Sequence, residues 1–226
     1  MSNDVFLVVE GLTEQLFVNQ VLAPYCAMRG VFLHPTQVPK KGGKGGDVRF
    51  ERVKTCVGNF LKQRSDTRVG TFFDYYGLGD WPSLDEVRNT SGLSPAEIEA
   101  RLNEAATEEL RRALPELDVV GRFVPFMAVH EFEALLFSDA EVLASALGIE
   151  KVSVEEVLQE YGSPEKINTR PDKIPSRHLD GWCGGRYMKT VQGIAIADKI
   201  GIDKMRVASP NFSDWLNRLG CGRICL

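Results

Sequence analysis

The feature that most constrains the fold is a short apolar run followed by a glycine turn and a helix-forming segment. Residues 5–9 read Val-Phe-Leu-Val-Val, which is typical of a buried strand. Gly11 permits a sharp turn after this strand. Thr13 is a candidate cap for a helix over residues 14–28, which Pro24 could kink. The sequence therefore predicts that the chain begins with a strand–turn–helix unit.

The same alternation continues through the first half of the chain. Three more strands are predicted, over residues 31–38, 69–74 and 121–129. Helices are predicted over residues 48–64 and 95–114, and the second carries a capping box, Ser94-Pro95-Ala96-Glu97. Residues 39–46 are predicted to be a basic glycine-rich loop, and residues 75–93 are also predicted to be a loop. Alternating strands and helices predict an α/β fold with a parallel or mixed sheet that helices cover on both faces.

The second half of the chain is predicted to be mostly helical. The helical patterns cover residues 139–147, 153–161, 187–200 and 210–219. A polar stretch rich in Pro, Lys and Arg lies between them, over residues 163–177. No linker composition separates the halves. We therefore expect an α/β core over residues 1–138, with residues 139–226 as a helical elaboration packed on the same domain.

Charge and composition narrow the functional classes. The chain has 226 residues and a formal net charge of -4. This argues against a protein that binds phosphates without specificity through a basic surface, but not against a nucleic-acid enzyme that uses metal ions. The absence of a basic leader and of an apolar stretch of about 18–20 residues predicts a cytoplasmic protein without a membrane span.

The five cysteines of the chain form no Cys-x-x-Cys pair. For a reducing compartment we expect free thiols, most of them structural. Cys221 and Cys225 are four residues apart and could bind a metal only together with other ligands.

Acidic residues follow three of the predicted strands. Glu10 follows the first, Asp74 ends the third, and Glu131 and Glu133 come directly after the fourth. Parallel strands present their carboxyl ends at one edge of a sheet, where open α/β sheets bind ligands. Glu14, in the first helical turn, could point back to the same place. Carboxylates gathered in this way would repel an anion, and they suit Mg²⁺ or Mn²⁺.

Structural roles are the alternative for each of these residues. An acid at the start of a helix is favourable without any ligand, because the helix dipole is positive there. His130 is a candidate general acid or base, or a hydrogen-bonded structural residue. Tyr75 and Tyr76 could stack on a base or pack against the sheet.

Several motifs resemble a known fold family. Glu10-Gly-Leu-Thr-Glu14 and Phe73-Asp-Tyr-Tyr-Gly77 resemble the metal-binding Toprim fold of topoisomerases, primases and overcoming-lysogenization-defect (OLD) nucleases. The closer resemblance is to a Toprim-like bacterial family of unknown function that is often encoded beside an SMC- or ABC-type ATPase. It also covers four further segments, which are His130-Glu-Phe-Glu-Ala-Leu-Leu-Phe-Ser-Asp139, Pro164-Glu-x-Ile-Asn168, Pro175-Ser-Arg177 and Ser209-Pro-Asn-Phe-Ser-Asp-Trp215.

The resemblance implies a Toprim-like (Rossmann-like) α/β fold with a mostly parallel sheet flanked by helices. It also implies a metal-dependent nuclease that acts on DNA or RNA. Glu10 and Asp74 would hold Mg²⁺ or Mn²⁺, and Glu14, Glu131 and Glu133 would complete the site. The resemblance further implies a role in anti-phage defence with an ATPase partner, and a homo-oligomer is left open. The sequence departs from the Toprim pattern at Tyr76, because an Asp-x-Asp pair would place a second aspartate there.

Basic residues are candidates for stabilising charge on a phosphodiester. Lys173 and Arg177 lie in the polar stretch, with a solvated loop as the alternative. The lysines of residues 39–46 could contact a nucleic-acid backbone, although this loop is not a nucleotide P-loop. Two further classes stay open, a non-catalytic subunit that binds the ATPase and a phosphotransfer or nucleotidyl-transfer enzyme.

Overall fold

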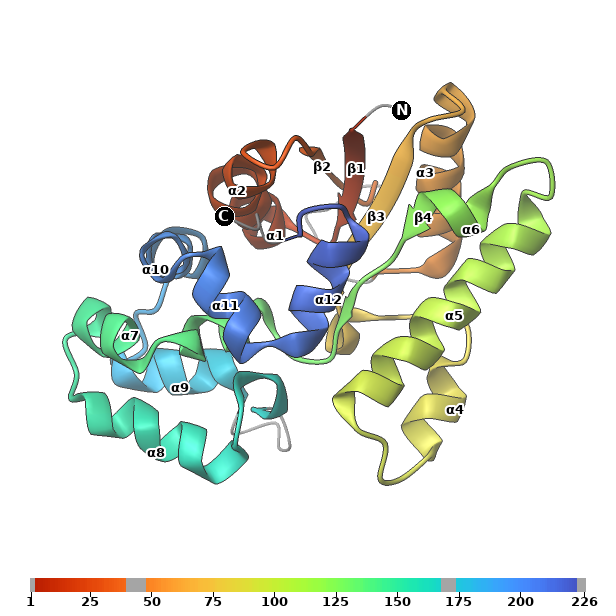
Figure 1. The fold of residues 1–226 in the computed structure, drawn as a ribbon. Coiled ribbons are helices and arrows are strands. Elements are labelled where there is room, and N and C mark those ends of the chain that lie inside the picture. The colour runs from red at the N-terminus through yellow and green to blue at the C-terminus, as the bar shows by residue number, and fades with distance from the viewer. Residues whose placement is uncertain (1–2, 40–47, 168–173, 223–226) are drawn as a thin grey trace.

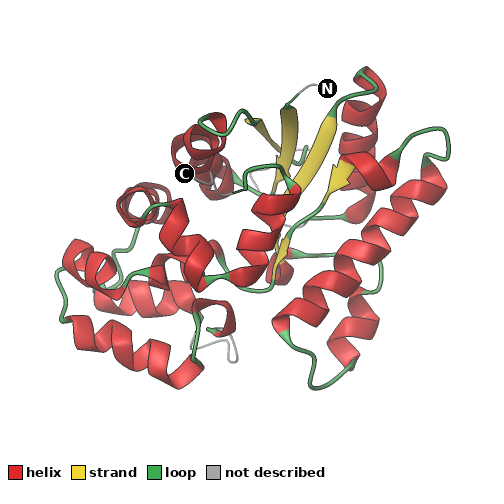
Figure 2. Cartoon of the chain, viewed as in Figure 1, coloured by secondary structure: helices red, strands yellow, loops and turns green. Residues whose placement is uncertain are grey.

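The computed structural model of the protein describes residues 3–39, 48–167 and 174–222, and it confirms the predicted α/β fold (Figure 1). A sheet of parallel strands lies at its centre, in the order β2-β1-β3-β4, with β5 also pairing with β3 (Figure 2). The strands are β1 (Asp4–Val9), β2 (Phe32–Gln37), β3 (Arg68–Asp74), β4 (Phe123–Val124) and β5 (Met127–Ala128).

Helices cover both faces of the sheet. The α-helices of the first half are α1 (Leu12–Phe17), α2 (Ala23–Ala27), α3 (Phe50–Gln63), α4 (Leu84–Asn89), α5 (Pro95–Ala113) and α6 (Val119–Arg122). Those of the second half are α7 (Ala140–Leu147), α8 (Lys151–Tyr161), α9 (Pro175–Trp182), α10 (Ile194–Ile200), α11 (Ile202–Ala208) and α12 (Pro210–Arg218). Short 3-10 helices are η2 (Tyr75–Gly77), η3 (Phe132–Ser138) and η4 (Pro164–Lys166), and π-helical turns are η1 (Val18–Leu22) and η5 (Lys189–Gly193).

Alternation along β1 divides the interior into two cores. Val5, Leu7 and Val9 point to the face that α1, α2 and the helices of the second half cover. Val8 points to the other face and joins a core with α3 and α5. Figure 1 shows these two groups of helices on opposite sides of the sheet. The helices of the second half thus share a core with β1 and help to fix its carboxyl end.

The first predicted helix differs from expectation at its start. It begins at Leu12 with Gly11 as the capping residue, so the prediction that Thr13 caps it is wrong. The chain then runs through α1, the π-helical turn η1 and α2. This wider turn comes shortly before Pro24 in the chain. Pro24 has no backbone N–H and so cannot donate an α-helical hydrogen bond.

The fourth predicted strand is shorter than expected and is interrupted. β4 pairs with β3 at Val69 and Gly70, and β5 pairs with β3 at Phe73 and Asp74. Pro125 lies between them and cannot donate to the ladder. The predicted loop over residues 75–93 contains η2 and α4, and the polar stretch contains η4 and the first part of α9.

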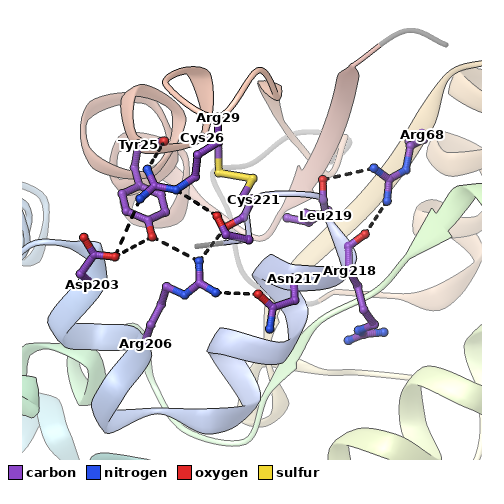
Figure 3. Close-up of a disulfide and its surroundings, with 11 residues drawn as sticks. Tyr25, Cys26, Arg29, Arg68, Asp203, Arg206, Asn217, Arg218, Leu219 and Cys221 are labelled. Carbon is purple, nitrogen blue, oxygen red and sulfur yellow. Dashed lines mark hydrogen bonds and ion pairs between the residues drawn. A yellow bond between two sulfur atoms is a disulfide. The ribbon is translucent and has the colours of Figure 1, made fainter. Parts of the chain in front are cut away.

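The expectation that all cysteines are free is wrong, because Cys26 and Cys221 form a disulfide across a separation of 195 residues (Figure 3). The bond joins α2 to the segment that follows α12. Cys56 and Cys183 are free thiols. Cys225, a candidate metal ligand, lies outside the described residues.

Three arginines line the same junction, and we call Arg29, Arg68 and Arg206 the arginine seam (Figure 3). Each donates to backbone carbonyl groups near the end of α12, which helical hydrogen bonds leave without partners. The donor–acceptor distances are 3.1 Å from Arg29 Nε to Gly222 O, 3.1 Å from Arg68 Nη1 to Leu219 O, and 2.6 Å from Arg206 Nη1 to Cys221 O. The seam therefore ties the end of the C-terminal helix to β3, to α11 and to the turn that follows α2.

Within the described residues, none of the helices combines the length and the apolar character that crossing a bilayer requires.

Candidate metal centre

The acids predicted from the sequence gather at the carboxyl edge of the sheet. β1 and β3 are parallel neighbours, and the chain leaves them at Glu10 and Asp74. β5 is parallel to β3 on its other side, and Glu131 follows it closely. Electrostatic coupling joins these residues with Glu14 and Glu133. We call these five side chains, Glu10, Glu14, Asp74, Glu131 and Glu133, the acid cluster.

Glu10 lies directly against the turn η2. A Cβ atom built on Gly77 would lie 2.5 Å and 2.6 Å from the two carboxylate oxygens of Glu10. Any other residue at this position would displace the carboxylate or the turn. The glycine of the Phe-Asp-Tyr-Tyr-Gly motif is thus required by close approach, a role that the sequence did not reveal.

Glu14 points back to the turn before its helix, as predicted. The backbone N–H of Gly11 donates to Glu14 Oε2 at 3.1 Å. Burial raises the pKa of Glu14. The carboxylate therefore caps the helix start and at the same time adds negative charge beside Glu10.

Among the described residues, positive charge does not compensate for the burial of Glu10 and Asp74. Burial, with a contribution from the charge of Glu14, raises the pKa of Glu10 to about 7. Burial also raises the pKa of Asp74 to about 7, and the charges of Glu10 and Glu131 add to the effect. The N–H of Tyr76 donates to Asp74 Oδ1 at 2.8 Å but does not offset the burial. Both carboxylates would be stabilised by a cation.

A lysine that sequence reasoning missed provides part of the missing charge. Lys189 Nζ lies 3.1 Å from Glu133 Oε1 and 3.7 Å from Glu131 Oε1. The side chain of Glu133 is only 1% exposed. Glu131 Oε2 also accepts the backbone N–H of Ser176 at 2.9 Å, which brings the start of α9 to the cluster.

Nothing in the local sequence of Lys189 marks it as a site residue. It lies far along the chain from the acids, in a segment where only a helical pattern was visible. The tertiary packing of η5 against α1 and η3 places it at the acid cluster.

The other predicted site residues lie elsewhere or deeper. His130 is buried, and burial lowers its pKa to about 4, so its imidazole is neutral at neutral pH. This favours a packing role, and a role in proton transfer stays a prediction. Arg177 is exposed on α9, and within the described residues its side chain forms no ion pair with the acid cluster. Lys173 lies outside the described residues, as do residues 40–46 of the basic loop.

The two tyrosines after Asp74 have different environments. Tyr75 is buried, as expected for packing, and its ring meets that of Tyr76 edge-on at 5.1 Å between centroids. Tyr76, which stands where a second aspartate was expected, is 55% exposed. The position of the expected second aspartate thus contributes no acid to the cluster. Glu131 and Glu133 come instead from the segment after β5.

The donor set fits a hard divalent cation in its chemistry but is not arranged as a finished site. All its donors are carboxylate oxygens, and among the described residues two of the five carboxylates form ion pairs with one ammonium group, that of Lys189. In residues 3–39, 48–167 and 174–222, however, no group of three or more His, Cys, Asp or Glu side chains is placed so that it could hold a metal ion. The side chains of the acid cluster would have to move before they could hold an ion together.

Comparison with known proteins identifies the family of the chain. A family model described as Domain of unknown function (DUF4276) matches residues 9–220. No curated protein and no solved structure matched the chain significantly. The matched range extends from the last residue of β1 past the end of α12, so it includes the whole acid cluster and the arginine seam. The chain therefore belongs to the DUF4276 family.

Proposed function

We propose that the protein is a metal-dependent nuclease that hydrolyses phosphodiester bonds in DNA or RNA. The observation that carries the proposal is the convergence of five carboxylates at the carboxyl edge of a parallel sheet, where among the described residues a single lysine is ion-paired with two of them. Open α/β sheets bind ligands at this edge, and such an excess of carboxylates is suited to a divalent cation.

The roles of the residues follow from their positions. Glu10 and Asp74, at the ends of neighbouring strands, would hold the ion, and Glu14, Glu131 and Glu133 would complete a site for one or two ions. A bound Mg²⁺ or Mn²⁺ would make a coordinated water a better nucleophile and neutralise charge on the phosphodiester. Gly77 keeps the turn η2 clear of the Glu10 carboxylate. A role in anti-phage defence beside an SMC- or ABC-type ATPase rests on the sequence resemblance alone.

The proposal is tested by metal binding first and cleavage second. Calorimetric titration of the purified protein with Mn²⁺ should show binding, and Glu10→Gln should abolish or greatly weaken it. Labelled single-stranded and duplex DNA and RNA should then be cleaved with Mn²⁺ by the wild type and not by Glu10→Gln. Absence of Mn²⁺ binding to the wild-type protein would refute the proposal.

A specific observation favours a second candidate, a non-catalytic interaction subunit. Glu14, Asp74 and Glu131 each accept a backbone N–H, from Gly11, Tyr76 and Ser176, at the start of a helical segment. Fixing the start of a helix is a sufficient role for an acid with such a partner, and no metal ion is needed to explain it. In that case the wild-type protein would not bind Mn²⁺, and Glu10→Gln would have the same effect in cells as the wild type.

A further inference from the structure

The ion pair of Lys189 has an unusual setting for a surface residue. Its ammonium group contacts Glu133 Oε1 at 3.1 Å, and no other group of the described residues donates a hydrogen bond to this oxygen. Glu133 is almost completely buried, whereas the lysine side chain is 45% exposed. A buried carboxylate therefore depends on a cation that reaches it from the surface.

The charge of Lys189 acts on most of the acid cluster. It lowers the pKa values of Glu10, Glu14 and Glu133, which burial raises. In the other direction, burial lowers the pKa of Lys189, but the charges of Glu133 and Glu131 outweigh this and raise it. Lys189 is thus held in its charged form and serves as the resident counter-ion of the cluster.

The segment that carries Lys189 is fixed against the elements that carry the acids. Lys189 is the first residue of the π-helical turn η5, which contacts α1 and η3. α1 carries Glu14, and η3 carries Glu133. Gly193 ends the turn, and a Cβ atom there would lie 2.6 Å from the hydroxyl oxygen of Tyr187. The backbone of η5 is therefore closely packed, while the ammonium group is carried on a flexible four-carbon stem.

We propose that Lys189 is a tethered cation that occupies part of the acid cluster in the metal-free protein and must be displaced when a divalent cation binds. This inference rests on the proposed function and concerns its regulation. A divalent ion brings twice the charge of the ammonium group, so exchange is favourable once enough metal is present. The half-exposed ammonium can move into water, where it is well solvated. Lys189 would therefore set the metal concentration at which the site fills.

The experiment compares Mn²⁺ binding to the full-length wild type and to Lys189→Met, which keeps most of the length of the side chain without its charge. Titration calorimetry should show Mn²⁺ binding about ten-fold tighter to Lys189→Met, because a competing cation is gone. Thermal unfolding supplies a second readout. Without metal, Lys189→Met should have a lower melting temperature than the wild type, because Glu133 loses its partner. Mn²⁺ should raise the melting temperature of Lys189→Met more than that of the wild type. Lys189→Arg, which keeps the positive charge, should not bind Mn²⁺ more tightly than the wild type does.

Lys199→Met is the matched control, since it removes an exposed lysine from α10. Its Mn²⁺ affinity should equal that of the wild type. Equal or weaker Mn²⁺ binding by Lys189→Met, with clear binding by the wild type, would overturn this inference and leave the proposed function standing. If neither protein binds Mn²⁺, the proposed function fails and the inference fails with it.

Discussion

The acid cluster and the arginine seam are both groups of like charges in the same small protein. They differ in how far the surrounding residues compensate for the burial of those charges. In the seam, the guanidinium group of Arg206 is buried and donates to Cys221 O and Asn217 Oδ1, at 2.6 Å each, and to the hydroxyl of Tyr25 at 3.2 Å. In the acid cluster, by contrast, Glu10 and Asp74 have pKa values raised to about 7 by burial.

The difference separates structure from candidate function. The seam arginines donate to neutral carbonyl, amide and hydroxyl oxygens, with Asp203 as an ion-pair partner of Arg29, and charges satisfied in this way hold a chain segment in place without a ligand. Carboxylates that outnumber the positive charges around them, as the acid cluster does among the described residues, retain a free-energy cost of burial that a bound cation can relieve. The comparison predicts that substitutions in the seam change stability and not metal affinity, and that substitutions in the cluster do the reverse.

The largest effect on stability is expected for Arg206→Met. The substitution leaves a buried carbonyl, the Asn217 amide and the Tyr25 hydroxyl without their donor. We expect the free energy of unfolding, measured in urea, to fall by about 3 kcal/mol. Mn²⁺ affinity should not change, and a large loss of affinity in a folded Arg206→Met would break the comparison. Arg64→Met, which removes an exposed arginine paired with Asp66, should unfold like the wild type.

The reverse pattern is expected for Glu10→Gln. Loss of a ligand should weaken Mn²⁺ binding about 100-fold, or about 2.7 kcal/mol, by calorimetry. The metal-free variant should be at least as stable as the wild type, because a carboxylate disfavoured by burial has been neutralised. Glu99→Gln, at a buried acid outside the cluster, should keep wild-type Mn²⁺ affinity. A Glu10→Gln protein that is markedly less stable but binds Mn²⁺ normally would show that Glu10 is structural.

A smaller effect on the cluster is expected for Gly77→Ala. The new methyl group would collide with the Glu10 carboxylate and push it from its place. Mn²⁺ affinity should fall about ten-fold, close to 1.4 kcal/mol. Gly181→Ala in α9, where a Cβ atom would meet no other atom within 4 Å, should leave metal binding unchanged. Equal Mn²⁺ affinity of both variants would mean that the position of Glu10 is unimportant for the ion.

Glu99 sharpens the comparison because it is a buried acid that belongs to neither region. Burial raises its pKa to about 8, although Arg218, at 3.7 Å, lowers it. In the unfolded chain this carboxyl group loses its proton near the ordinary glutamate pKa of 4.5, so stability falls as pH rises from there to about 8.

Glu99→Gln removes this pH-dependent cost. The variant should be about 1 kcal/mol more stable than the wild type at pH 8, and close to it at pH 4, where both states of the wild type are protonated. Urea unfolding at pH 4, 6 and 8 measures the difference. A constant difference across these pH values would show that Glu99 does not titrate on unfolding in this range.

Elements with a strong local signal could be predicted from the sequence. The apolar run of β1 and the capping box of Ser94 and Glu97 specify their segments without tertiary information, and the structure contains both. The helices α4, with six residues, and α9, with eight, lie among glycines and prolines. They are too short to show a reliable period, so tertiary contacts decide their conformation.

The candidate site was predictable only in part, for a similar reason. Strand ends place Glu10, Asp74 and Glu131 at one edge, so the rule for parallel sheets was sufficient to bring them together. The contact of Lys189 with Glu133 depends on how η5 packs, and the approach of Gly77 to Glu10 depends on the path of a turn. The pairing of Cys26 with Cys221 likewise depends on the overall fold, which no local pattern encodes.

The Cys26–Cys221 bond has a topological consequence for the acid cluster. It closes the chain between these residues into a covalent ring, from which the two ends of the protein extend as tails. Glu10 and Glu14 lie on the N-terminal tail, whereas Asp74, Glu131 and Glu133 lie on the ring. A single proteolytic cut anywhere within the ring would open it without releasing any acid of the cluster, so the nicked protein would remain one covalent molecule until the disulfide is reduced.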